Sequence, residues 1–248
     1  MNDRLRTSIA RRELTLDQVA EHARVDPKTV QRWIAGRVPH ARHQWAVAAL
    51  LKEDANYLWP EPIGVSPTAS NAELLSVYPH RADVPFDLWE NLFERAERNI
   101  DILVYAALFL HEQYPALNRL LTDKCTAGCQ VRVLLGDADS RKIIERGTEE
   151  EYGEGIESRC RVALRHYEPL VGTPNFELRL HDTTLYNSIY RFDANMIVNA
   201  HVWGANAYSS PVLHLRQVQG GSLFAGYAKS LDAVCAAARP VEQATAAS

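Results

Sequence analysis

The stretch LTLDQVAEHARVDPKTVQRWIAGR, residues 14–37, predicts two short helices joined by a tight turn. Thr15, followed three residues later by Gln18, has the spacing of a capping box and marks the start of the first helix. Asp26 marks the start of the second helix, because it offers an N-cap acceptor just before Pro27, which lacks an N–H. Two short helices with a tight turn between them are typical of a helix-turn-helix.

The second of these helices has its polar side chains grouped on one face. Val30, Trp33 and Ile34 form the apolar stripe that we expect to be buried, and Gly36 is typical of the residue after a helix end. The polar residues must then project outward, on the part of the motif that enters the major groove of DNA. Gln and Arg side chains have the donor geometry that reads adenine and guanine edges. Together with residues placed to reach phosphates, the predicted DNA contacts are Gln18, Lys28, Thr29, Gln31, Arg32, Arg37 and Arg42.

The residues around this motif predict a basic, all-α N-terminal domain of about five short helices. Leu5 and Ile9 face one core at helical spacing, a fourth helix is expected over about 42–52, and a last turn begins at Asp54. Residues 1–52 carry ten Lys and Arg against five Asp and Glu, although the whole chain has a net charge of −4. A basic segment on an otherwise acidic chain favours contact with phosphates.

Residues 3–59 resemble the Cro/repressor-like helix-turn-helix family, also called the xenobiotic-response-element family. The resemblance rests on LDQVAEHARVDPKTVQRWIAG (16–36) and on the closing LLKEDANYLWP (50–60), with the Gln, the Ala and the Trp-x-x-Gly at the family's spacings. The chain departs from the family at Ile34, where an acidic residue often follows the Trp. The resemblance implies a sequence-specific DNA-binding domain and a role in transcription regulation, with double-stranded DNA as the partner.

The length of 248 residues and the composition along the chain predict two domains. We expect the helix-turn-helix domain over 1–59, a Pro-, Ser- and Gly-rich linker over 60–72, an α/β domain over 73–240 and a disordered tail over 241–248. No apolar run approaches the ~20 residues that span a bilayer. The N-terminus lacks the apolar segment of a signal peptide, so we expect a cytoplasmic protein without membrane contact.

The four cysteines fit a reducing compartment. Cys125 and Cys129 lie four apart on one face of an expected helix, and no further metal ligand is near them in sequence. Burial as small apolar side chains is therefore the preferred interpretation, and the sequence predicts neither a metal nor a cofactor.

The second domain alternates predicted helices with predicted strands. Apolar runs predict strands from residue 100 and over 130–136, and FELRL (176–180) alternates cleanly. NSIYRF and MIVNAHV predict a hairpin turned at residues 193–195. Helices are expected between and after these strands, over 87–98, 113–127, 154–164 and 222–237. This order predicts an α/β domain with a mixed sheet.

The element order and the run YNSIYRFDANMIVNAHVWGAN (186–206) resemble the phospholipase D fold in its single-motif form, over about residues 85–238. Active members carry His-x-Lys and, after four further residues, an Asp. The His attacks phosphorus, and the Lys stabilises the charge on the phosphoryl oxygens. With Asp193 as the anchor, Tyr186 and Ser188 stand at the His and Lys positions. The chain therefore lacks both groups, and we predict a pseudo-enzyme with no catalytic residues.

A cleft without a catalyst is available for sensing a small molecule. By analogy with the sugar-sensing regulators of the TrmB type, which use a catalytically dead domain of this fold, the pocket would lie at the strand ends. The candidate ligand-binding residues are Tyr105, Asp137, Tyr186, Ser188, Asp193, His201 and Trp203. The resemblance also implies a homodimer, and a domain that only pairs two chains is the alternative to a sensor. Two alternatives stay open: a phosphodiesterase or nuclease of this fold with an N-terminal targeting module, and an interaction module that never contacts DNA.

Overall fold

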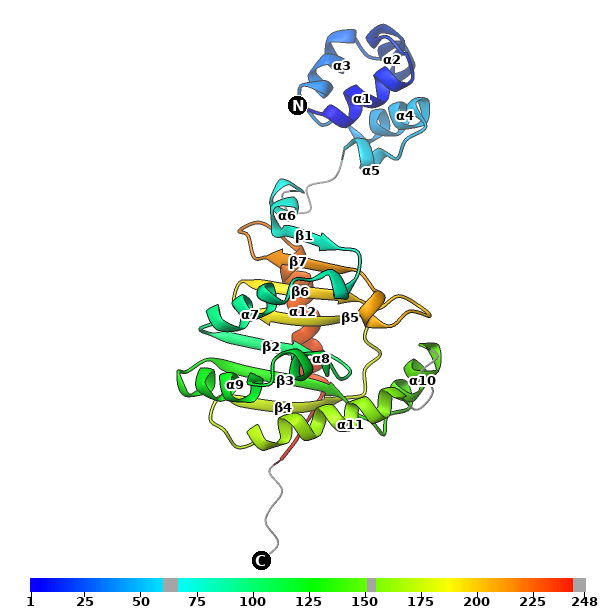
Figure 1. The fold of residues 1–248 in the computed structure, drawn as a ribbon. Coiled ribbons are helices and arrows are strands. Elements are labelled where there is room, and N and C mark those ends of the chain that lie inside the picture. Colours follow the sequence, from blue (N-terminus) through cyan, green and yellow to red (C-terminus); the bar gives the residue numbers. More distant parts are fainter. Residues whose placement is uncertain (60–66, 151–154, 243–248) are drawn as a thin grey trace, which may run out of the picture. The chain divides into compact units, whose positions relative to one another are not determined.

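The structure is a computed structural model that describes residues 1–59, 67–150 and 155–242. Its contacts divide the chain into two compact units, Met1–Gly64 (unit 1) and Val65–Ser248 (unit 2), which are described separately (Figure 1).

Unit 1 is helical, and its helices surround one small apolar core. Leu5, Val30, Val47 and Leu58 are fully buried in it, and Trp33 packs edge-on against Trp59 with ring centroids 6.4 Å apart. The prediction that Trp33 belongs to the core is confirmed. The helices are α1 (Asp3–Arg11), α2 (Leu16–Ala23), α3 (Pro27–Ile34), α4 (Ala41–Leu51) and α5 (Ala55–Leu58).

The boundaries of α2 and α3 follow the local signals in the sequence. Thr15 Oγ1 accepts a hydrogen bond from Gln18 N, and Gln18 Oε1 accepts one from Thr15 N, so the predicted capping box is present. Arg24 ends α2 in the left-handed conformation, with φ +52°. Asp26 Oδ1 accepts from Lys28 N, and Gly36 adopts φ +114° just after α3, as predicted for both ends.

Unit 2 is built on an eight-stranded mixed sheet with the order β1-β7-β6-β5-β2-β3-β4-β8. Strands β2, β3 and β4 run parallel, and every other neighbouring pair is antiparallel. The strands are β1 (Leu74–Tyr78), β2 (Asn99–Leu103), β3 (Gln130–Gly136), β4 (Phe176–His181), β5 (Asn187–Phe192), β6 (Asn195–Ala200), β7 (Val212–Arg216) and β8 (Arg239–Pro240). The predicted mixed sheet is therefore present.

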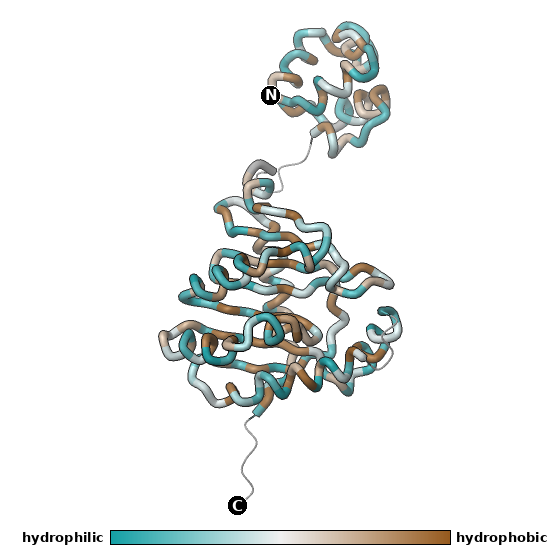
Figure 2. Tube along the Cα trace, viewed as in Figure 1, coloured by the Kyte–Doolittle hydropathy of each residue, from teal (hydrophilic) through white to brown (hydrophobic). Residues whose placement is uncertain are grey.

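Helices cover both faces of this sheet (Figure 1). The long α12 packs on β4, β5 and β7 on one face, whereas α7, α9 and α11 pack on the other. The buried strands β2 and β3 are apolar over most of their length, as strands covered on both faces must be (Figure 2). The helices and short 3-10 turns are α6 (Pro67–Glu73), η1 (Arg81–Asp83), α7 (Phe86–Arg95), α8 (Phe109–Gln113), α9 (Leu117–Thr126), α10 (Arg141–Glu149), α11 (Gly155–Tyr167), η2 (Glu168–Leu170), η3 (Ala207–Ser209) and α12 (Leu223–Ala237).

The structure differs from the sequence prediction at several elements. The linker predicted over 60–72 is wrong for 67–72, because Pro67–Glu73 form α6; residues 60–66 lie outside the described residues. The helix predicted over 113–127 is present as α9 but begins only at Leu117, after Pro115, and the preceding α8 was not predicted. Strands β1 and β7 and helix α10 were not predicted. Of the predicted tail, residues 243–248 also lie outside the described part, as does the start of the helix predicted over 154–164.

The predicted burial of Cys125 and Cys129 is confirmed, and each is 1% exposed. Burial raises the pKa of both thiols, and that of Cys125 rises to about 11. Among the described residues, no helix combines the length and hydropathy that crossing a membrane requires.

A buried carboxylate joins the two ends of unit 2. Glu73, at the end of α6, is 1% exposed, and its carboxylate accepts hydrogen bonds from Leu223 N (2.8 Å) and Phe224 N (3.2 Å). It thereby caps the N-terminus of α12, whose own N-cap residue Ser222 makes no side-chain capping bond. A Cβ at Gly221 would lie 2.2 Å from the Glu73 carboxyl carbon, so this position has room only for glycine.

We expect Glu73→Ala to lower the free energy of unfolding of unit 2 by about 1–2 kcal/mol, because two buried N–H groups lose a charged acceptor. Chemical denaturation followed by circular dichroism measures this loss. Gly221→Ala is expected to destabilise the same unit, whereas the exposed Gly128→Asn, at φ +98°, is a mild control. A Glu73→Ala protein as stable as the parent would contradict the capping role.

Candidate functional site

The outer surface of α3 is a row of solvent-facing polar side chains. Lys28, Gln31 and Arg32 are exposed, and Thr29 is half-buried, while Val30 and Trp33 between them are in the core. Within the described residues, none of the side chains in this row forms an ion pair or a hydrogen bond with the rest of unit 1. Their polar groups are therefore available to an external partner. This row, Lys28, Thr29, Gln31 and Arg32, is called the α3 surface below.

The residues predicted to flank the α3 surface are also exposed. The Gln18 side-chain oxygen is held by Thr15 N at 2.8 Å, which leaves its amide N–H groups as donors beside the α2 N-terminus. Arg37 follows α3, and Arg42, at the start of α4, donates from Nε to His43 Nε2 at 3.1 Å. All seven predicted contact residues therefore present polar groups to solvent on unit 1.

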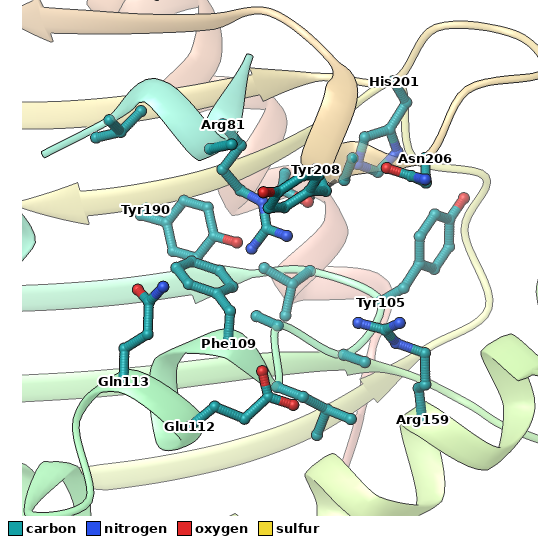
Figure 3. A pocket seen from close by; sticks show the side chains of 18 of the residues that line it. Arg81, Tyr105, Phe109, Glu112, Gln113, Arg159, Tyr190, His201, Asn206 and Tyr208 are labelled. Carbon is teal, nitrogen blue, oxygen red and sulfur yellow. Dashed lines mark hydrogen bonds between the residues drawn. The ribbon is translucent and has the colours of Figure 1, made fainter. Parts of the chain in front are cut away.

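Unit 2 contains a pocket of about 410 Å³ at the ends of the central strands β2, β5 and β6 (Figure 3). Strand β5 is antiparallel to both β2 and β6, so its start lies beside the ends of those two strands. The residues that follow β2 and β6 therefore meet the first residues of β5 at this end of the strands. Helices α8 and α11 and the turns η1 and η3 close the sides. The side chains that define it are Arg81, Tyr105, Phe109, Glu112, Gln113, Arg159, Ser188, Tyr190, His201, Asn206 and Tyr208.

Ser188 and His201 form a hydrogen-bonded pair in the pocket wall. Ser188 Oγ lies 3.0 Å from His201 Nε2, and His201 Nδ1 lies 3.1 Å from the carbonyl oxygen of Leu185. A carbonyl only accepts, so Nδ1 carries the ring proton and Nε2 accepts from the Ser188 hydroxyl. Burial and the positive charge of Arg146 lower the pKa of His201 to about 4, so the ring is neutral at pH 7.

Tyr105 and Arg146 fix this pair from two sides. The Tyr105 ring stacks on His201 with centroids 5.4 Å apart, and its hydroxyl accepts from Leu185 N at 2.8 Å. The buried Arg146 is paired with Glu149 and Glu150 and donates to the carbonyl oxygen of Ala205 at 3.0 Å. The wall of the pocket is thereby held in one arrangement.

The structure brings three of the seven predicted ligand-binding residues together, Tyr105, Ser188 and His201, all of which line the pocket. Tyr186 and Trp203 are 79% and 77% exposed and do not line it, because each sits in a loop just outside the strand ends. Asp137 lies elsewhere, with its carboxylate bound to Arg239 at 3.0 Å. These three residues therefore lie outside this pocket, and their predicted role in ligand binding stays a prediction.

Asp193 also lies outside this pocket, because it stands in the β5–β6 turn, at the opposite end of β5 from Ser188. Its carboxylate accepts three backbone hydrogen bonds, from Glu97 N (2.8 Å), Arg98 N (2.9 Å) and Asn99 N (2.7 Å). Partial burial opposes ionisation, but these donors prevail and lower the pKa of Asp193. Asp193 holds the hairpin against the start of β2.

The sequence did not predict the other polar and aromatic residues of the pocket. Arg81 comes from η1, Glu112 from α8, Arg159 from α11 and Tyr208 from η3, so they are scattered along the chain. Their neighbours in sequence form no motif. The only local signal was the abrupt end of the buried strand β2, after which Tyr105 and Phe109 both turn into the pocket.

No protein-family model and no curated protein sequence matches the chain. Among solved structures, an archaeal chromatin protein, TrmBL2, whose structure is described as showing a novel mode of DNA binding, is 12% identical with a TM-score of 0.43. A phosphatidylserine synthase from Haemophilus influenzae is 16% identical with the same TM-score. Each match covers 67% of this chain, but only 54% and 39% of the other protein. The conclusions below rest on the chain's own residues.

Proposed function

We propose that the chain is a sequence-specific DNA-binding regulator that reads a major-groove half-site through the α3 surface. The observation that carries this proposal is the row of exposed Lys28, Gln31 and Arg32, whose side chains pair with no other described residue, on a helix whose other face is anchored in the core. Arg and Gln at such positions donate to guanine and adenine edges. Gln18, Arg37 and Arg42 flank the row as phosphate contacts.

Selection of duplexes from a random library by the full-length protein, followed by sequencing, tests this proposal. We expect one enriched sequence, and an affinity that falls steeply as salt rises, because phosphate contacts release counterions. Retention on random duplex without enrichment would support non-specific binding only. Absence of retention at low salt would favour an interaction module that never contacts DNA.

The pocket of unit 2 is proposed as the site of a small-molecule effector. Its volume of about 410 Å³ and its mixture of aromatic walls with a few polar groups are typical of such sites. An effector changes DNA affinity only by its differential affinity for two arrangements of the protein. We therefore expect a bound effector to favour one arrangement of the paired chains over another.

Pairing of two chains is proposed to use the edge of the sheet at β1. Leu74, Leu75 and Val77 are 39%, 42% and 57% exposed, and within the described part of the chain β1 has a neighbouring strand, β7, along one edge only. An exposed apolar edge strand is a template for pairing with another strand. A dimer formed there would present two α3 surfaces to half-sites ~34 Å apart.

Val77→Lys is expected to raise the dissociation constant of this dimer by at least about tenfold, because a charged side chain on an edge strand opposes pairing. Light scattering coupled to gel filtration measures the mass. Val162→Lys on α11, where the parent valine is 40% exposed, is the matched control. If the Val77→Lys protein is still a dimer, the contact lies on another surface. If the parent protein is a monomer, the proposed pairing is refuted.

We also propose that unit 2 has no phosphodiesterase activity. Tyr186, at the position of the nucleophilic His, is exposed and does not line the pocket, and Ser188, at the position of the Lys, carries no positive charge to stabilise a phosphoryl group. The expected result is no hydrolysis of bis(p-nitrophenyl) phosphate above a buffer blank. Turnover that disappears in Ser188→Ala would instead establish the enzyme alternative.

A further inference from the structure

The Arg81 side chain enters the pocket from η1 (Figure 3), and no hydrogen bond of its head group to another described residue is present. Its Nε is buried and has no hydrogen-bond acceptor, and no carboxylate of the described residues lies within ion-pair distance of the guanidinium. A desolvated cation without an acceptor costs free energy. Most buried or half-buried arginines of this protein, such as Arg132 and Arg146, are instead paired with carboxylates.

The Arg81 guanidinium lies over two aromatic rings, which offer it no hydrogen-bond acceptor atom of a carboxylate or carbonyl. Its Cζ lies 3.9 Å from the ring centroid of Phe109 and 5.9 Å from that of Tyr208. These contacts are of the cation–π type. The N–H donors of a guanidinium all lie in its plane, so they remain available to an acceptor that approaches edge-on from within the pocket.

The charges around the pocket leave this cation uncompensated. Burial is the main cause that lowers the pKa of Arg81; Tyr190 opposes it, Arg159 across the pocket lowers the pKa further, and Glu112 and Tyr208 oppose the shift less strongly than Arg159 contributes to it. An arginine stays charged despite such a shift. The Glu150 carboxylate, also in the lining, is already bound by Arg146 at 2.6 Å. Glu112 is exposed and makes no ion pair with Arg81.

One side of the pocket is apolar and largely aromatic. Trp89, Phe109 and Tyr190 contact one another edge-on, with ring centroids 4.9–6.1 Å apart, and form one side of the pocket together with Val104 and Ala106. Such a surface accommodates a flat apolar group. A ligand suited to the whole pocket therefore has an anionic end and an apolar body.

We propose that this pocket binds a small organic anion whose carboxylate or phosphate accepts hydrogen bonds from Arg81 and whose aromatic body packs against the rings. This specifies the chemical class of the effector and rests on the proposed effector role of the pocket. The anion replaces the missing acceptor at Nε and separates Arg81 from Arg159. The aromatic body displaces water from the walls of Trp89 and Tyr190.

Isothermal titration calorimetry on the full chain without DNA tests the proposal with three probes of similar shape: benzoate, phenyl phosphate and the neutral benzamide. We expect at least one anion to bind, and benzamide to bind at least about tenfold more weakly than that anion. Benzoate alone would identify a carboxylate ligand, and phenyl phosphate alone a phosphate ligand. No binding of either anion up to about 10 mM would overturn the proposal, as would equal binding of benzamide.

Arg81→Met keeps most of the side-chain length and removes the charge, and we expect it to weaken binding of the anion at least about tenfold. Arg141→Met on α10, outside this pocket, is the matched control and is expected to bind like the parent. If Arg81→Met fails to fold, Arg81→Lys, which keeps the charge but loses the planar donor edge, should still bind more weakly. Unchanged binding in the variant that folds would overturn the role of Arg81.

The test of anion binding can succeed or fail independently of the test of DNA binding. Arg32→Ala is expected to leave anion binding unchanged, because Arg32 belongs to unit 1. Anion binding by a protein that selects no DNA would refute the regulator role and leave the anion site intact. Selection of DNA by a protein that binds no anion would refute only the proposed anion site.

Discussion

Replacing Arg32 by alanine is expected to weaken binding to the selected duplex about 10- to 100-fold, equivalent to about 1–3 kcal/mol. Arg32 is exposed on the outer face of α3, one position before the core residue Trp33, so its removal deletes the donor fork without disturbing the core. Fluorescence anisotropy with a labelled duplex measures the affinity. Arg141→Ala, which removes the same charge from an exposed helix of unit 2, is the matched control.

The pattern of losses distinguishes base contacts from phosphate contacts. Arg32→Ala should relax sequence preference at one position of the duplex, whereas Arg37→Ala should weaken all sequences alike and reduce the salt slope by about one. Equal affinity of the parent and the Arg32 variant for the selected duplex would refute the assignment of α3 as the recognition helix.

Asp193→Ala is expected to lower the free energy of unfolding of unit 2 by about 2–4 kcal/mol, because it leaves three backbone N–H groups without their charged acceptor. These donors, Glu97 N, Arg98 N and Asn99 N, join the β5–β6 turn to the start of β2. Asp193→Asn keeps an acceptor oxygen and should lose less. Asp139→Ala, at an exposed side chain, is the control and should change the stability by less than about 0.5 kcal/mol.

The pH dependence of the Asp193 effect has a definite sign. The folded state lowers the pKa of this carboxyl, so its contribution is present above the unfolded pKa and is lost as pH falls through the folded pKa. The parent and the alanine variant should therefore converge in stability on acidification. Calorimetric unfolding at a series of pH values measures this. A difference that grows toward acid pH, or no difference at neutral pH, would contradict the structural role.

The helices of unit 1 could be predicted because their signals are local. The capping box at Thr15, the Asp26-Pro27 start and the φ-positive Gly36 each act within a few residues, and each is present as predicted. The hairpin of β5 and β6 was predictable for the same reason. Strand β1 was missed because LLSVY (74–78) is apolar at every position except Ser76, so it shows no alternation of apolar and polar residues.

The pocket could be predicted only in part, because sheet order and not sequence spacing assembles it. Tyr105, Ser188 and His201 were found by following strand ends, but the same reasoning also selected Asp137 and Asp193, which lie outside this pocket. Those two carboxylates are used by the fold, on Arg239 and on backbone N–H groups, since polar groups at strand ends usually satisfy nearby donors. Arg81 carried no local signal in the sequence. Its proposed role depends on the folded pocket, in which no described residue accepts a hydrogen bond from its buried Nε.

The bond between Glu73 and the first turn of α12 determines where unit 2 can be cut. A fragment that begins at Leu74 keeps every strand of the sheet yet removes the acceptor of Leu223 N and Phe224 N, so its last helix starts uncapped. A fragment that begins before Pro67 retains α6 and the carboxylate with it. The shorter piece should therefore melt at a lower temperature, although it differs only by a segment that composition alone would discard as spacer.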